Sequence, residues 1–249
     1  MRLWCVLVAA LSEGAAFKLA VREASAQELQ PARPSFRAIT ELAAGALFEP
    51  ATDRDRNALA GALGKDFAGK FGGRCSEAAL LLALDDTSDE YVGVCGVGVE
   101  QLSPAAVSDR RARGAEAELL RPRPLLSNLA VSPTYRRRGI AKRLCRAAEA
   151  TASSWGYSEL LIKVEADNTR ARKLYRKLGY RTVGEDPNAE RPVAAGGRLR
   201  FVPATTIAMR KDLRFPPVDA LVAPSALILL AAGVASAPDR VEAWLRAIL

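Results

Sequence analysis

The central stretch of the chain, Leu125–Val183, carries the clearest pattern of apolar and polar positions. Leu125–Val131 is a short apolar run that ends at a Ser-Pro pair, which predicts a buried strand. A helix is predicted from there to about Trp155, because apolar residues recur at helical spacing along one face. These residues are Ile140, Leu144, Ala148 and Ala152. Gly156 then ends the helix, as a glycine just past a helix commonly does.

The same stretch continues with a strand, a helix and another strand. Leu160–Val164 is short and apolar, as a buried strand is, and Asn168–Lys177 is predicted as a helix closed by Gly179. Tyr180–Val183 returns as a strand. The order strand, basic turn, helix, strand, helix, strand predicts an α/β fold.

Weaker patterns precede this stretch. Phe36–Ala46 is predicted as a first strand and turn, and Thr52–Ala68 as a helix. Two apolar runs, Ala78–Leu84 and Tyr91–Glu100, are separated by a polar, acidic cluster and predict a hairpin. Glycines inside the second run indicate a strand that another part of the chain approaches closely. They are Gly93, Gly96 and Gly98.

Two further segments lack a regular pattern. Ser103–Arg123 is polar and contains prolines, and Glu185–Pro203 is rich in glycine and proline, so both are predicted as irregular loops. A strand, Thr205–Arg210, follows the second loop. The chain therefore divides into a presequence over residues 1–35, a folded domain over 36–213 and an apolar tail over 214–249.

The two ends suggest targeting and association. Met1–Ala16 has an early arginine, an apolar run and small residues suited to cleavage, and Phe17 follows. This arrangement resembles the two-part plastid presequence of algae, so a plastid location is expected; secretion and a cytoplasmic start are the alternatives. Ala220–Pro238 is uncharged and approaches the length of a membrane span. A packed or partner-binding helix, a membrane anchor and disorder all stay open for it.

The composition of the chain limits the kinds of partner and active site that it can have. The net charge is +8, but 28 acidic residues are mixed with 36 basic ones, and no aromatic interleaving suggests a nucleic-acid partner. The chain has no histidine, which excludes histidine triads and argues against a catalytic metal. Its four cysteines lack the spacing of a zinc site or a disulfide framework.

The turn before the central helix carries the candidate chemistry. Arg136, Arg137 and Arg138 precede Gly139, Ile140 and Ala141. A helix start leaves about four amide groups without partners and carries roughly half a positive charge. Small residues there let an anion approach, so the sequence predicts a diphosphate cradle. A nucleotide triphosphatase would need Lys-Ser/Thr after the last glycine, and a dinucleotide fold would need three glycines.

The Arg-x-x-Gly-x-Ala spacing resembles the acyl-CoA loop of the GNAT acetyltransferase superfamily. The similarity extends to Ser127–Val131 before the loop and to the block from Asn168 through Leu174-Tyr175 to Gly179-Tyr180 after it. It covers roughly Phe36–Leu213. The resemblance implies a GNAT fold, with a mixed and mostly antiparallel sheet, flanking helices, and an acetyl-CoA cleft between splayed parallel strands.

The same resemblance implies roles for individual residues. The amides and side chains of the turn would bind the pyrophosphate, and the main chain at Leu129, Ala130 and Val131 would contact the pantetheine arm. Asn168 would contact the coenzyme as well, although it is equally suited to capping a helix. Tyr175 would protonate the departing thiolate, although by itself it could be a packing residue.

The sequence identifies the general base and the acceptor substrate less specifically than it identifies the coenzyme-binding residues. Without histidine, a carboxylate or a water relay must take the amine proton, and Glu100 and Glu165 are the candidates. The core resembles plastid GNAT enzymes that modify lysine side chains and protein N-termini. The expected function is therefore acetyl-CoA-dependent transfer to a protein amine; the alternatives are a small-amine acetyltransferase and a CoA-binding module without turnover.

Overall fold

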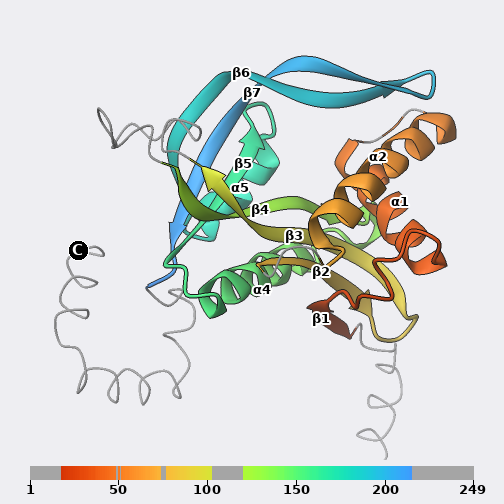
Figure 1. Cartoon of the computed structure of the whole chain (residues 1–249), viewed down its shortest axis with the longest axis horizontal. Helices are drawn as coiled ribbons and strands as arrows, with labels where there is room; N and C mark the ends of the chain where they lie inside the picture. The colour runs from red at the N-terminus through yellow and green to blue at the C-terminus, as the bar shows by residue number, and fades with distance from the viewer. Residues whose placement is uncertain (1–17, 49, 51, 74–76, 103–119, 215–249) are drawn as a thin grey trace, which may run out of the picture.

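The computed structural model describes residues 18–48, 50, 52–73, 77–102 and 120–214 (Figure 1). Seven strands form one sheet in the order β1-β2-β3-β4-β5-β7-β6. The strands are β1 (Leu19–Glu23), β2 (Ala78–Asp85), β3 (Glu90–Leu102), β4 (Arg121–Val131), β5 (Glu159–Glu165), β6 (Arg181–Ala195) and β7 (Arg198–Asp212). Every neighbouring pair is antiparallel except β4 and β5, which are parallel. The expected mixed, mostly antiparallel sheet is confirmed.

Helices cover both faces of the sheet. On one face, α1 (Pro34–Phe48) and α2 (Asp53–Phe71) pack with Leu80, Leu82 and Val94. On the other, α4 (Ile140–Ser154) packs against the strands together with Tyr175 of the short helix α5 (Thr169–Lys177). A short 3-10 turn, Pro133–Tyr135, precedes α4. The predicted strand–helix–strand–helix–strand order over Leu125–Val183 is confirmed, and α4, β5 and α5 lie within a few residues of their expected bounds. The last strand, predicted to end at Val183, instead runs on to Ala195 as β6.

The first helix corrects the sequence analysis. Phe36–Ala46, predicted as a strand and turn, lies inside α1. Pro34 occupies the first helical position, where its missing amide hydrogen costs no hydrogen bond. The buried residues recur every three or four positions, which is the period of a helix rather than a strand. They are Phe36, Ile39, Thr40, Ala43 and Ala44.

The second correction concerns Glu185–Pro203, which is not an irregular loop. Most of it belongs to β6 and β7, a long hairpin that closes at Gly196-Gly197. Both glycines have positive φ, +61° and +75°, as a tight two-residue hairpin turn requires. Pro187 and Pro192 are tolerated because β6 is the edge strand, and its pairing is irregular between Asp186 and Ala189. Figure 1 shows this hairpin reaching from the sheet toward α2.

The sheet also begins earlier than the predicted domain. β1 pairs with β2 from Leu19↔Asp85 to Glu23↔Leu81, so residues assigned to the presequence belong to the fold. Residues 1–17 and the tail from 215 onward, including Ala220–Pro238, lie outside the described residues, as does most of Ser103–Arg123. No helix in the described part of the chain is both long and apolar enough to cross a membrane.

Candidate active site

The two parallel strands separate partway along the sheet. β4 and β5 pair only at Leu125↔Leu161 and Leu126↔Ile162, yet β4 runs on to Val131. β5 likewise continues to Glu165, where it pairs with β7 on its other side. The edge of β4 that faces β5 is therefore unpaired beyond Leu126, which is the splay expected of a coenzyme cleft.

A bulge lies where the strands separate. The register between β3 and β4 shifts from Gly96↔Ser127 to Val94↔Ala130. Asn128, inside the bulge, has a φ of +53°, which is uncommon for a residue with a side chain. A bulge leaves backbone groups outside the regular ladder. The main chain at Leu129 is thus released from strand pairing next to the cleft.

The basic turn leads from the end of β4 into α4. Gly139 is the residue that precedes the helix, with a φ of +80°, and it provides no side-chain cap for the first amides. A Cβ added to Gly139 would meet nothing within 4 Å, so the approach to these amides is open. Arg137 has a φ of +68°, and the side chains of Arg137 and Arg138 are exposed. The turn thus places an exposed glycine and two exposed arginines directly before the start of α4.

Arg136 differs from the other two arginines. Its guanidinium donates to the Ala46 carbonyl at the end of α1 over 3.2 Å, and to the Val131 carbonyl over 3.4 Å. These contacts tie α1 to the end of β4. The described geometry therefore gives the Arg136 side chain an anchoring role, which the sequence analysis did not anticipate.

Tyr135 anchors the turn on its other side, and sequence analysis missed it. Its hydroxyl lies 3.2 Å from Asp85 Oδ2 and 3.1 Å from Glu90 Oε2, at the ends of β2 and β3. The Arg138 guanidinium lies 5.0 Å from the centre of the Tyr135 ring, within range of a cation–π contact. An aromatic residue directly before an arginine run was the available signal.

Tyr175 is the one fully buried residue of α5, at 5% exposure. Its ring meets Tyr180 edge to face, with centroids 5.8 Å apart. Burial, and then the nearby Cys145 and Cys95 thiols, raise the pKa of its phenol well above the ordinary value. The phenol is therefore protonated at neutral pH, as a proton donor must be.

Asn168 is the N-cap of α5. Its Oδ1 accepts a hydrogen bond from the Ala171 amide over 3.0 Å. The capping role weighed from the sequence is therefore confirmed. The residue is also exposed, so capping leaves its amide nitrogen accessible.

The two candidate bases lie on different strands, and each has a cationic neighbour. Glu100 on β3 lies 3.8 Å from Lys70 of α2, with 42% of its side chain exposed. Glu165 at the end of β5 lies 3.1 Å from Arg191 of β6, with 34% exposed. Each candidate base is therefore a partly exposed carboxylate with a cation from another element beside it.

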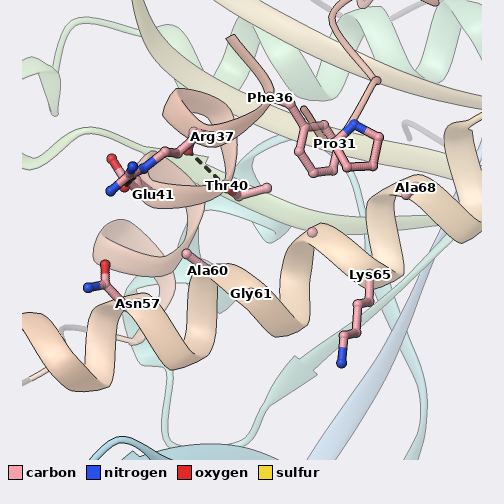
Figure 2. A pocket seen from close by; sticks show the side chains of 11 residues that line it. Pro31, Phe36, Arg37, Thr40, Glu41, Asn57, Ala60, Gly61, Lys65 and Ala68 are labelled. Carbon is pink, nitrogen blue, oxygen red and sulfur yellow. Dashed lines mark hydrogen bonds and ion pairs between the residues drawn. The ribbon is translucent and has the colours of Figure 1, made fainter. Parts of the chain in front are cut away.

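A cavity of about 470 Å³ lies apart from the splay, between α1 and α2 (Figure 2). Phe36 and Ala60 contribute apolar surface, and Arg37, Glu41 and Lys65 stand around it. None of its lining residues is a predicted site residue. In the part of the chain that the structure describes, no three acidic or cysteine residues cluster closely enough to hold a metal ion.

These features define an α/β domain with a splayed parallel strand pair and a glycine-opened helix start beside it. A family model described as the acetyltransferase (GNAT) family matches residues 38–180, more than half of the chain. The chain therefore belongs to this family.

Two Arabidopsis thaliana proteins are similar to the chain over a short stretch. GCN5-related N-acetyltransferase 4, chloroplastic, is 43% identical over 58 residues, covering 23% of this chain and 20% of that protein. GCN5-related N-acetyltransferase 10, chloroplastic, is 37% identical over 62 residues, covering 25% and 24%. The matched stretch thus spans a quarter or less of these relatives' length.

Solved structures resemble the fold over most of the domain. Arabidopsis thaliana NAA60 in complex with acetyl-CoA has a TM-score of 0.52 at 16% identity, covering 80% of this chain and 100% of that one. A GNAT-family acetyltransferase from Streptococcus pneumoniae has a TM-score of 0.51 at 18% identity, covering 78% and 99%. At such identities the likeness concerns the fold alone.

Proposed function

We propose that the protein is an acetyl-CoA-dependent N-acetyltransferase that transfers acetyl to a protein amine, either a lysine side chain or an N-terminal amine. The observation that carries this proposal is the splay of β4 from β5 beside the open start of α4. A splayed strand offers unpaired main chain to an extended arm, and the helix start offers amides and positive charge to a diphosphate.

The donor is held along this path. The amides of Arg137, Gly139, Ile140 and Ala141 bind the pyrophosphate, and the exposed Arg137 and Arg138 side chains add charge-assisted contacts. Arg136 contributes through its main chain, because its guanidinium is bonded to carbonyls of α1 and β4. Leu129, Ala130 and Val131 offer main-chain groups to the pantetheine arm. Asn168, at the start of α5, contacts the same arm through its amide.

The acetyl group then moves in a ternary complex. The neutral amine attacks the thioester carbonyl carbon, so a C–N bond forms as the C–S bond breaks. The amide at Leu129, freed by the bulge at Asn128, stabilises the negative charge on the carbonyl oxygen. Tyr175 gives its proton to the leaving thiolate, and Glu100 or Glu165 takes the proton from the amine, directly or through water. The products are an N-acetylated acceptor and free CoA.

The relatives' names support a plastid location, since both Arabidopsis proteins are called chloroplastic. This location belongs to the proposal, together with the expected presequence. It would be tested by the position of the full chain, fused to a fluorescent protein at its C-terminus, in plastid-bearing cells.

Incubation with acetyl-CoA and a mixed peptide library tests the activity. We expect thiol release that matches peptide acetylation, with mass spectrometry locating acetyl on lysine or on the N-terminus. Binding of acetyl-CoA without release would indicate a non-catalytic module and overturn the proposal. Release with polyamines but never with peptides would indicate a small-amine enzyme and overturn the protein acceptor.

A further inference from the structure

A buried ion pair joins β7 to α4, and neither of its two residues has been assigned a role above. Lys211 Nζ on β7 lies 2.7 Å from Glu149 Oε2 on α4. The two side chains are only 9% and 10% exposed. Removing two charges from water costs free energy that their attraction recovers only in part. The attraction between Glu149 and Lys211 therefore does not by itself explain why both charges are buried here.

The pair continues into Tyr180. The Lys211 ammonium lies 5.8 Å from the centre of the Tyr180 ring, within reach of a cation–π contact. Glu149 Oε1 and Tyr180 Oη are both buried and have no hydrogen-bond partner among the described residues. Burial and then the Glu149 carboxylate raise the pKa of the Tyr180 phenol, as expected if these two groups are close together. Lysine, carboxylate and phenol therefore form one buried cluster.

Tyr180 in turn touches Tyr175. Gly179 has a φ of +92°, which ends α5 and folds the chain back so that the Tyr180 amide donates to the Tyr175 carbonyl over 3.0 Å. The two rings then meet at 63° with centroids 5.8 Å apart. Tyr175 is the one residue that the nine-residue helix α5 buries, and the ring contact with Tyr180 is one of the contacts that fix its angle in the core.

We propose that Glu149 and Lys211 are positioning residues that orient Tyr175 through the ring of Tyr180. Glu149 holds the lysine ammonium over the Tyr180 ring, and that ring holds Tyr175 at the angle at which its hydroxyl points to the thiol of the bound coenzyme. The ion pair itself never touches the substrate. This inference rests on the proposed role of Tyr175 as the proton donor.

The test is a double-mutant cycle on the full chain, with steady-state kinetics for acetyl-CoA and the best peptide from the library. Lys211→Met removes the charge and keeps an unbranched side chain that is one atom shorter. We expect kcat to fall about 10- to 100-fold, the size of effect that a misplaced catalytic group produces, with little change in KM for acetyl-CoA. In the Tyr175→Phe background the same change should lower kcat no further, because the group that it positions is already gone.

Three further variants separate positioning from folding. Lys211→Arg keeps the charge and should recover most of kcat. Glu149→Leu combined with Lys211→Met replaces the pair by apolar groups; it should melt near the parent's temperature but retain the low kcat. Lys177→Met, an exposed lysine on α5, is the matched control and should leave kcat unchanged.

The outcomes are distinct. If Lys211→Met lowers kcat equally in the parent and in the Tyr175→Phe background, the pair has a merely structural role and the inference is wrong. If the apolar double variant keeps full kcat, it is wrong as well. If Tyr175→Phe alone leaves kcat unchanged, the failure lies with the proposed role of Tyr175.

Discussion

The amide of Gly197, at the tip of the β6–β7 hairpin, donates a hydrogen bond of 2.7 Å to Asp55 Oδ1 in the first turn of α2. Thr52 binds the other oxygen of the same carboxylate over 2.7 Å. The tip of the longest hairpin is thus fastened to a helix start 142 residues earlier in the chain. The Asp55 carboxylate thus links the hairpin tip to the start of α2.

Asp55→Ala is expected to release the hairpin tip. Hydrogen exchange should become faster at residues 190–203, since the charge-assisted bond to Gly197 is lost. Asp53→Ala is the matched control, because Asp53 lies in the same helical turn but pairs with Arg56, three residues further along α2. Unchanged exchange in Asp55→Ala would show that the strand pairing alone holds the tip.

Gly139→Asp should weaken acetyl-CoA binding by about 100-fold or more, equivalent to about 2.7 kcal/mol. A carboxylate at this position would repel the diphosphate from the amides of α4. Gly156→Asp is a close control, since Gly156 also has positive φ, +90°, and open space around it, but lies at the other end of α4. Calorimetric titration with acetyl-CoA compares the two. Equal affinities of the two variants for acetyl-CoA would show that the diphosphate does not bind at this turn.

Tyr175→Phe should lower kcat by about 10²- to 10⁴-fold while leaving acetyl-CoA affinity nearly unchanged, because proton donation matters only as the thiolate leaves. Tyr157→Phe deletes a different phenol hydroxyl, one that donates to Glu77 over 2.9 Å, and should retain kcat. A Tyr175→Phe enzyme with full turnover would return Tyr175 to the packing residues.

The free energy of unfolding should fall as pH rises above about 10, the ordinary pKa of a phenol. Burial raises the pKa of both Tyr175 and Tyr180, so the folded protein keeps protons that the unfolded chain releases. Each phenol then lowers the free energy of unfolding by about 1.4 kcal/mol per pH unit, until the pH reaches the pKa of that phenol in the folded protein. Urea unfolding between pH 8 and 11 measures this slope, and Tyr175→Phe should make it shallower.

Gly96→Ala should destabilise the fold by about 1–3 kcal/mol through overpacking. A Cβ at Gly96 would lie 2.4 Å from the Phe71 ring and 2.9 Å from Ser127 Oγ. Gly98→Ala, two residues along the same strand, meets nothing closer than 3.7 Å and is the control. Thermal unfolding of both variants tests the difference; equal melting temperatures would mean that Phe71 yields at little cost.

The central part of the fold was predictable because its signals are local. Apolar spacing and the closing glycines predict the bounds of α4, β5 and α5 to within a few residues of the observed ones. The prediction for Phe36–Ala46 was wrong, although Pro34, the alanines and the spacing of the buried residues of α1 all indicate a helix. β1 was missed because a five-residue strand at the edge of a sheet has little pattern of its own.

The β6–β7 hairpin shows where composition misleads. Glycine and proline ordinarily break elements, yet Gly196-Gly197 supplies the turn, and the edge position of β6 tolerates Pro187 and Pro192. The direction of the Arg136 side chain was equally hidden, because its partners, the carbonyls of Ala46 and Val131, become neighbours only once the chain has folded. Sequence spacing located the basic turn but not the use of each arginine.

β4 and β5 meet at the weakest junction of the sheet, which we call the seam. Within the sheet, only two residue pairs join the four strands on one side to the three on the other. A coenzyme lying in this seam would bridge both sides and add to the cohesion of the whole domain. The stability of the protein in the cell would then depend on the concentration of acetyl-CoA, and the coenzyme-free protein would be the least stable form.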